Sequence, residues 1–227
     1  MKASSLYSPA DFAARAYARL AQVESKDALD LSIDAPLGDH TINPGLSLPE
    51  EVRSRNRAAA VLIPVVAHEG EAKMLLTTRT EHLPSHAGQV AFPGGKIEEE
   101  DGSAHAAALR EAEEEIGLPR HHVELLGYLP PYQTMTGFRI VPVVAEVRPG
   151  FALKLDPSEV ANVFEVPLSF LMSADNHKRE SRQWRGQLRQ YYVMPYKDHY
   201  IWGVTAGIIR RLYLQLYAAN QGKADEH

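Results

Sequence analysis

Residues 94–118 form the segment that most constrains the fold, because a pair of glycines leads through an acidic loop into a two-faced helix. The helix is expected from Ser103 to Ile116, ending at Gly117 and Pro119. A helix places Glu111, Glu114 and Glu115 on one face, because they are related by i, i+3 and i, i+4 spacing. The opposite stripe is apolar and consists of Leu109, Ala112 and Ile116. This pattern predicts a helix that lies against a sheet and presents a carboxylate cluster outward.

The carboxylate cluster stands at the less favourable end of its helix. Negative partial charge already gathers at a helix C-terminus, and like charges one turn apart add about 0.2–0.5 kcal/mol of repulsion per pair. Divalent cations remove this conflict, since hard ions such as Mg²⁺ or Mn²⁺ prefer carboxylate oxygens. A solvated acidic face with Arg110 as its counter-ion is the alternative interpretation.

The rest of the chain predicts a mixed sheet covered by helices, because strands and helices alternate without regular βαβ units. Strands are expected at residues 58–67, 74–79, 88–92, 123–129 and 138–147. Further helices are expected at 11–22, after Ser8 and Pro9, and at 203–220. Residues 23–56 contain many turn-forming residues and are expected to be irregular. Segments 163–170 and 191–200 fit neither periodicity well.

Composition excludes several classes of protein. The 227 residues include no cysteine, so disulfides, zinc–thiolate sites, iron–sulfur sites and a cysteine nucleophile are excluded. The formal charge of −5 argues against a nucleic-acid partner. The longest apolar run, 58–67, is too short for a membrane span, and the N-terminal residues lack the apolar core of a secretory signal. We therefore expect a cytoplasmic protein without a membrane partner.

The segment from Gly95 to Leu118 resembles the Nudix box, G-x5-E-x7-R-E-U-x-E-E-x-G-U, in which U is apolar. The matching residues are Gly95, Arg110, Glu111, Ala112, Glu114, Glu115, Gly117 and Leu118. The interval before Arg110 is one residue longer than the general pattern, and Asp101 stands where the first Glu would fall. No Gly-x-Ser-x-Gly, His-Glu-x-x-His or P-loop motif points to another chemistry.

The preceding residues are similar to the coenzyme A pyrophosphatase branch of that family, whose motif is L-L-T-x-R-[SA]-x3-R-x3-G-x3-F-P-G-G. Thr80 and Pro84 depart from it, Pro84 replacing an Arg. The resemblance extends over residues 57–212 and includes GYLPPYQTMTGFRIVPVV and HYIWGVTAGII. The matching residues are Leu75, Leu76, Thr77, Arg79, Gly88, Phe92, Pro93, Gly94 and Gly95.

The resemblance implies an α/β/α sandwich with a mixed β-sheet that hydrolyses a small-molecule diphosphate with Mg²⁺ or Mn²⁺. The expected organisation is an N-terminal helix and irregular arm (1–56), the hydrolase domain (57–220) and a tail (221–227), with a homodimer as one possible assembly. Coenzyme A or a derivative is the expected substrate. The alternatives are another nucleoside diphosphate derivative, such as ADP-ribose, a dinucleotide or a nucleoside triphosphate, and a non-catalytic ligand-binding module.

The resemblance also assigns roles to individual residues. Metal ligands are expected to be Glu111, Glu115, Glu114 and the carbonyl of Gly94. Glu114 is the expected general base, and Glu111 and Arg110 complete the catalytic set, Arg110 by orienting a helix carboxylate. Substrate contacts are expected from Arg79, Lys96 and Gln89. Asp101 is expected either to bind a metal through water or to cap the helix in competition with Ser103. Less specific candidates near the site are His86, Glu159, Tyr132, Phe138, Tyr200 and Trp202.

Overall fold

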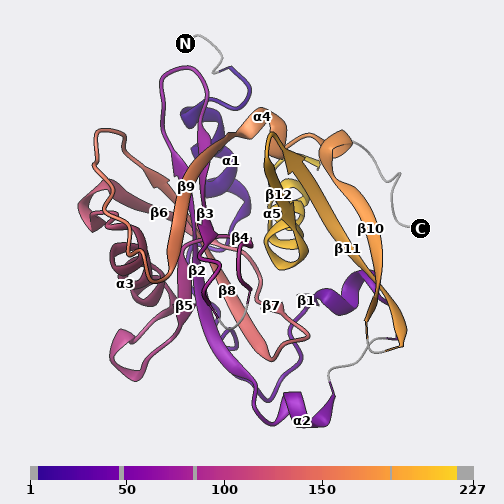
Figure 1. Ribbon diagram of the computed structural model, residues 1–227. Coiled ribbons are helices and arrows are strands. Elements are labelled where there is room, and N and C mark those ends of the chain that lie inside the picture. The colour runs from indigo at the N-terminus through magenta and orange to yellow at the C-terminus, as the bar shows by residue number, and fades with distance from the viewer. Residues whose placement is uncertain (1–4, 46–48, 84–85, 185, 219–227) are drawn as a thin grey trace.

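The computed structural model describes residues 5–45, 49–83, 86–184 and 186–218, and its described strands form two sheets (Figure 1). The strands of the large sheet are β1 (Leu37–Gly38), β2 (Arg57–Val66), β3 (Lys73–Arg79), β4 (Val90–Ala91), β5 (Gly94–Lys96), β6 (Val123–Tyr128), β7 (Tyr132–Gln133), β8 (Phe138–Val147) and β9 (Val160–Pro167). The small antiparallel sheet consists of β10 (Lys178–Trp184), β11 (Gln187–Tyr196) and β12 (His199–Trp202).

The large sheet is mixed, with β2 and β8 as its longest pair. These two strands run parallel over ten residues, from Arg57 opposite Phe138 to Val66 opposite Val147. The order of strands is β1–β7–β8–β2–β3–β4, while β5 pairs with β2, β6 with β8 and β9 with β3. Most of the other pairings among the described strands are antiparallel, and of these strands only β1 and β7 also run parallel. A mixed α/β fold was predicted, and the structure confirms it.

Helices cover both faces of the large sheet because both faces are apolar. Along β2, Leu62 and Val66 join the core beneath α3 (Ala104–Ile116). Ile63 and Val65 point the other way, into a core shared with α1 (Pro9–Arg19), α5 (Gly203–Leu216) and the small sheet. Figure 1 shows α3 on the left of the sheet and α5 on its right, behind β12. The layers therefore form the expected α/β/α sandwich.

Short elements connect these layers. They are η1 (Asp39–Ile42), α2 (Glu50–Arg53), η2 (Glu99–Asp101), η3 (Arg120–His122), α4 (Leu168–Leu171) and η4 (Ala174–Asn176). Residues 23–56 are largely irregular, as expected. The division of the chain into an arm, a domain and a tail stays a prediction, and residues 221–227 lie outside the described ranges. In the described part of the chain, no helix has the length and apolar character needed to cross a lipid bilayer.

The boundaries of several elements differ from the predictions. The first helix starts at Pro9 and ends at Arg19 rather than Gln22, because Leu20 is extended and Ala21 bridges to Tyr128. The last helix ends at Leu216, and the predicted extension beyond residue 218 lies outside the described residues. Residues 163–170 contain most of β9 followed by α4. Residues 191–200 belong to the hairpin of β11 and β12, whose partner β10 is so polar that periodicity did not reveal it.

Candidate active site

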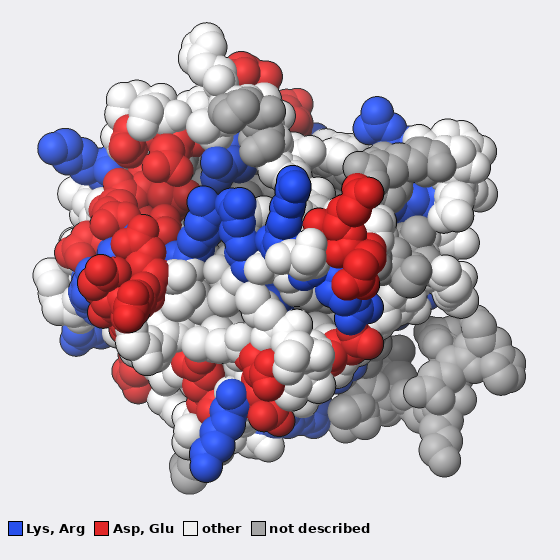
Figure 2. Space-filling model, turned by 90° about the horizontal axis from the view of Figure 1, so that it is seen from below, with Lys and Arg blue, Asp and Glu red and all other residues white. Residues whose placement is uncertain are grey.

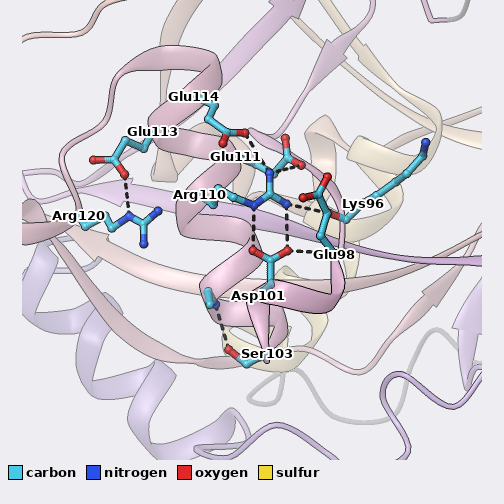
Figure 3. Close-up of polar contacts among 10 residues, drawn as sticks. Lys96, Glu98, Asp101, Ser103, Arg110, Glu111, Glu113, Glu114 and Arg120 are labelled. Atoms are coloured by element: carbon cyan, nitrogen blue, oxygen red, sulfur yellow. Dashed lines mark hydrogen bonds and ion pairs between the residues drawn. The ribbon is translucent and has the colours of Figure 1, made fainter.

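Arg110 is the centre of a hydrogen-bonded cluster on the outward face of α3 (Figure 3). Its Nε and Nη2 donate to the two carboxylate oxygens of Asp101 at 2.8 and 2.9 Å. Its Nη1 donates to Glu111 at 3.1 Å and to Glu114 at 2.9 Å, and Nη2 also donates to the Lys96 carbonyl at 3.1 Å. These five contacts use all five N–H donors of the guanidinium. Arg110 therefore has no donor left for a substrate and holds two box carboxylates in place.

Asp101 provides the bidentate partner of Arg110 and does not cap α3. The cap of α3 is Ser103, whose hydroxyl accepts from the N–H of Ala106 at 3.1 Å. The hydrogen bond from Arg110 is the main cause of the lowered pKa of Asp101. Asp101 also accepts from the N–H of Glu98 at 2.8 Å, which anchors the acidic loop. The sequence predicted that Asp101 would either cap the helix or bind a metal through water. It did not predict the pairing of Asp101 with Arg110.

Gly94 and Gly95 bring the backbone of β5 directly against the α3 carboxylates. A Cβ atom on Gly95 would collide with the carboxylate of Glu111, so this approach requires glycine. The N–H of Leu62 donates to the Pro93 carbonyl, and the N–H of Ile97 donates to the Ala58 carbonyl. Hydrogen-bonded pairs alternate with non-hydrogen-bonded pairs in an antiparallel ladder, so the pair of Gly94 and Val61 is not hydrogen-bonded. The N–H and carbonyl of Gly94 consequently point away from β2, and the N–H donates to Glu115 Oε2 at 3.1 Å.

Glu115 is a buried carboxylate with little compensation for its charge. Only 3% of the residue is exposed. Burial raises its pKa to about 8, against the opposing effects of the Gly94 N–H and of Arg79, whose Nη1 lies 3.8 Å from Glu115 Oε1. Burial also raises the pKa of Glu111, although Arg110 opposes the shift. Additional positive charge at this point would therefore be stabilising.

The three predicted substrate-contacting residues lie in different positions around these carboxylates. Arg79 is beside Glu115, at the end of β3. Gln89 is next to Arg79, since the Arg79 N–H donates to the Gln89 carbonyl at 3.0 Å. The Gln89 side chain lies 2.8 Å from the His86 ring. Lys96 gives its carbonyl to Arg110, but its exposed side chain points away from the cluster in Figure 3.

The less specific candidates are dispersed. Glu159 contributes to the raised pKa values of Glu111 and Glu115, so its carboxylate belongs to the same electrostatic environment. Tyr132 is buried, and its hydroxyl donates to Asp39 at 3.0 Å. Tyr200 and Trp202 belong to the small sheet, where the Tyr200 hydroxyl donates to Glu180 at 2.7 Å. Phe138 begins β8, and Pro84 lies outside the described residues.

The donor atoms of the cluster suit a hard divalent cation, although the carboxylates do not converge on one point. Over the ranges that the structure describes, no three His, Cys, Asp or Glu side chains are gathered as a ready metal site. Glu111 and Glu114 turn one oxygen each to Arg110, and within those ranges their other oxygens, Oε2 and Oε1, have no hydrogen-bond partner. All available ligands are oxygens, and the buried charge of Glu115 needs compensation, so Mg²⁺ or Mn²⁺ fits the chemistry of this donor set.

A hollow of about 440 Å³ lies elsewhere, between the irregular segment 21–36 and the ends of β6 and β8. It contains none of the predicted site residues. Its lining includes Arg139, which is 2% exposed and donates to the carbonyls of Asp27, Asp30 and Ile33. These bonds show that Arg139 organises the irregular segment. The carboxylate cluster stays the candidate active site.

Comparison with known proteins decides the family. The NUDIX domain matches residues 56–187, more than half of the chain. The chain belongs to the Nudix family. A relative from Escherichia coli (strain K12), named "Uncharacterized Nudix hydrolase NudL", is 44% identical over 161 residues, which cover 71% of this chain and 83% of the relative. A protein of the same name from Photorhabdus laumondii is 44% identical over 168 residues, which cover 74% and 89% of the two chains.

A solved Nudix hydrolase from M. smegmatis, RenU, superposes with a TM-score of 0.43 at 22% identity, over 50% of this chain and 72% of its own. The assignment rests on the domain match and the two sequence relatives. As a Nudix hydrolase, the chain is a pyrophosphohydrolase that acts on acid anhydrides in phosphorus-containing substrates. Enzymes of this family generally use divalent metal ions.

Proposed function

We propose that this Nudix hydrolase cleaves the diphosphate of coenzyme A or its derivatives, releasing 3′-phosphoadenosine 5′-phosphate and the (acyl-)4′-phosphopantetheine part. The observation that carries the proposal is the junction of two motifs. The segment that resembles the coenzyme A branch ends at Gly94 and Gly95, which lie against Glu115 and Glu111 of the box. Arg79, from the same segment, is 3.8 Å from Glu115. A diphosphate bound between these groups would contact both motifs at once.

In the proposed reaction, water attacks one phosphorus atom while the bond from that phosphorus to the bridging oxygen breaks. Glu114 accepts the proton of the water at its carboxylate, and 59% of its side chain is exposed. Arg110 holds Glu111 and Glu114 in fixed orientations, and Arg79 offers a guanidinium to a phosphate oxygen. A divalent cation, Mg²⁺ or Mn²⁺, held by oxygens of Glu111, Glu114, Glu115 and the Gly94 carbonyl would supply charge neutralisation and a polarised water.

The test is turnover of a substrate panel by the purified protein with Mg²⁺ or Mn²⁺. Coenzyme A, an acyl-coenzyme A, ADP-ribose, NADH and a nucleoside triphosphate are compared by kcat/KM, with products identified by mass spectrometry. We expect coenzyme A or its acyl derivative to exceed the others by at least tenfold. Equal or better turnover of ADP-ribose or NADH would instead favour a general nucleoside diphosphatase, the candidate supported by the replacement of a motif Arg by Pro84.

Two variants separate an enzyme from a non-catalytic module. Glu115→Gln and Glu114→Gln remove one carboxylate charge each, and each should lower kcat by two or more orders of magnitude while circular dichroism stays unchanged. Glu113→Gln is the matched control, because Glu113 pairs with Arg120 on a different side of α3 from the cluster. Full activity in both cluster variants would contradict the assignment of the site.

A further inference from the structure

The outermost strand of the small sheet, β10, has an open edge. The sheet runs in the order β10–β11–β12, and β10 lies at the right-hand margin of the molecule in Figure 1. Residues 178–183 of this strand are all exposed. A strand at the edge of a sheet presents unpaired N–H and carbonyl groups, which can pair with a strand of another chain.

The contacts of Asn43 show which backbone groups of β10 point outward. Asn43 binds both backbone groups of Gln190 on β11: its Nδ2 donates to the carbonyl at 3.1 Å, and its Oδ1 accepts from the N–H at 2.7 Å. The backbone groups of Gln190 therefore point away from β10, and those of Ser181, the residue opposite, point away from β11. Because this orientation recurs at every second residue, Arg179 and Gln183 also direct their N–H and carbonyl groups to the open edge.

The two edges of the hairpin formed by β10 and β11 differ in how their backbone groups are satisfied. On the β11 side, β12 pairs as far as Val193, and Asn43 takes both groups of Gln190. On the β10 side, the outward backbone groups have no hydrogen-bond partner within the described residues, since β10 pairs with β11 alone. The β10 edge is therefore free to accept a further strand.

The charges of β10 are complementary to themselves under a two-fold axis. In an antiparallel pairing centred on Ser181, each Glu180 lies opposite Arg182 of the partner subunit. Moving the centre to Glu180 or to Arg182 would instead place two like charges opposite one another, which is destabilising. The pairing centred on Ser181 also includes all seven residues of β10, and it joins the outward groups of Arg179 to those of Gln183.

Arg182 lacks an acidic partner in its own chain. Within the described residues its guanidinium forms no ion pair, and it lies directly opposite Arg189 on β11, which pairs with Asp39. Like charges directly opposite each other destabilise a sheet. Glu180 is exposed, and its Oε2 accepts from the uncharged Tyr200 hydroxyl at 2.7 Å. A second copy of the strand would bring each of these two charges an opposite one.

Figure 2 shows charges of both signs on the side of the molecule that carries the small sheet. Acidic side chains predominate on the left, the side on which α3 lies in Figure 1, whereas acidic and basic side chains lie next to one another on the right. A surface of mixed charge can be complementary to a copy of itself, whereas a surface of one sign repels its copy. Pairing on the right would also leave the carboxylate cluster of α3 uncovered.

We propose that two copies of this chain pair antiparallel through β10, centred on Ser181, so that their small sheets join into one six-stranded sheet. Backbone hydrogen bonds from Arg179, Ser181 and Gln183 of each chain hold the strands together, and the pairs of Glu180 with Arg182 fix their register. Charged side chains on an edge strand commonly prevent such pairing. Here their order makes one register favourable and the neighbouring registers unfavourable, so it selects a second copy over an unrelated strand.

The first experiment is sedimentation velocity of the full-length chain over a series of concentrations. We expect dimers that dissociate at about micromolar concentrations, because a strand-edge interface is small. Glu180→Arg and Arg182→Glu should each raise the dissociation constant at least tenfold, and the double variant Glu180→Arg/Arg182→Glu should restore dimerisation. Glu69→Arg, an equal charge change in the exposed connection between β2 and β3, is the matched control and should leave the dimer unchanged.

A second experiment tests the register with single introduced cysteines, since the chain has none of its own. Two copies of Ser181→Cys would face each other across the axis with Cα atoms about 5.5 Å apart, within reach of a disulfide. Two copies of Gln183→Cys would be offset by about 13 Å along the strands and should not cross-link. We therefore expect a disulfide-linked dimer from Ser181→Cys alone. A chain that is monomeric at all concentrations, a dimer that ignores the charge reversals, or equal cross-linking of both cysteine variants would overturn the proposal.

Discussion

Arg110 shows how one side chain can hold several carboxylates of an acidic cluster in fixed positions. Its five donors serve Asp101 twice, Glu111, Glu114 and the Lys96 carbonyl. One positive charge thus faces three carboxylates, so the cluster keeps a net negative charge while its geometry is fixed. That combination suits an acidic site whose carboxylates have to be held in place, because the arginine limits repulsion without neutralising the cluster.

Replacing Arg110 by Lys should keep the charge and lose the geometry. An ammonium has three donors on one nitrogen and cannot bind Asp101 with two parallel bonds while also reaching both glutamates. We expect Arg110→Lys to lower kcat about 10–100-fold, with KM for Mg²⁺ raised. Arg120→Lys is the control, since Arg120 and Glu113 form a pair that is about half exposed, where such a change costs little. Equal activity of the two variants would contradict this role for Arg110.

The connection from α4 to the small sheet depends on a histidine that is kept neutral. The His177 ring lies with Nε2 2.7 Å from the Leu171 carbonyl and Nδ1 3.3 Å from Arg210 Nη1, and it contacts Tyr213 edge-on. Burial is the main cause that lowers the pKa of His177 to about 4, and Arg210 adds to the effect. Nδ1 therefore accepts from Arg210, and Nε2 carries the proton that binds Leu171.

Because the pKa of His177 is lowered in the folded state, we expect the protein to lose stability in mild acid. Above pH 6.5 the ring is neutral in both states, so its contribution to folding is fully present. As pH falls from about 6.5 toward 4, the unfolded chain takes up a proton that the folded chain does not, and stability decreases by at most about 3 kcal/mol. Urea unfolding of the wild type and His177→Gln between pH 7.5 and 4.5 checks this prediction. Parallel pH profiles for the two proteins would contradict it.

At the scale of the whole molecule, the N-terminal residues are built into the core rather than appended to it. Phe12 and Ala16 of α1 are completely buried in the core that also contains α5. Asp39 is 5% exposed, accepts from Tyr132 and the Met135 N–H at 3.0 Å each, and pairs with Arg189 of the small sheet. Phe12, Ala16 and Asp39 precede the region 56–187 that the NUDIX domain matches, whereas Tyr132 and Met135 lie within it.

A chain truncated to begin at Arg57 should therefore fail to fold cooperatively. Removal of α1 exposes the apolar surface beneath it, and the loss of a fully buried Phe alone costs about 2–3 kcal/mol. Removal of Asp39 leaves Arg189 and Tyr132 without this partner. We expect low soluble yield, dye binding typical of exposed apolar surface and no sharp thermal transition. A cooperative transition within about 5 °C of the full chain would instead show that residues 57–220 form an independent domain.

The sequence alone was sufficient to predict the mixed α/β class, the main strands, the carboxylate helix and the two glycines. These features depend on periodicity and on residue types within one segment, so they can be predicted without knowing any contact between distant segments. The strand from Lys178 to Trp184 was not predicted, because most of its residues are polar on both faces and show no apolar alternation. Its place in the sheet is specified by pairing with β11. The ends of α1 and α5 also differed, because strand bridging and packing decide where a helix stops.

Within the site, sequence spacing placed Glu111, Glu114 and Glu115 on one face, but it could not show how each is held. The bidentate pairing of Asp101 with Arg110 depends on how the acidic loop folds back over α3. The approach of Arg79 to Glu115 depends on strand register between distant segments. Local patterns thus determine which groups are present, whereas only tertiary packing decides which of them meet, because those contacts join residues that are far apart along the chain.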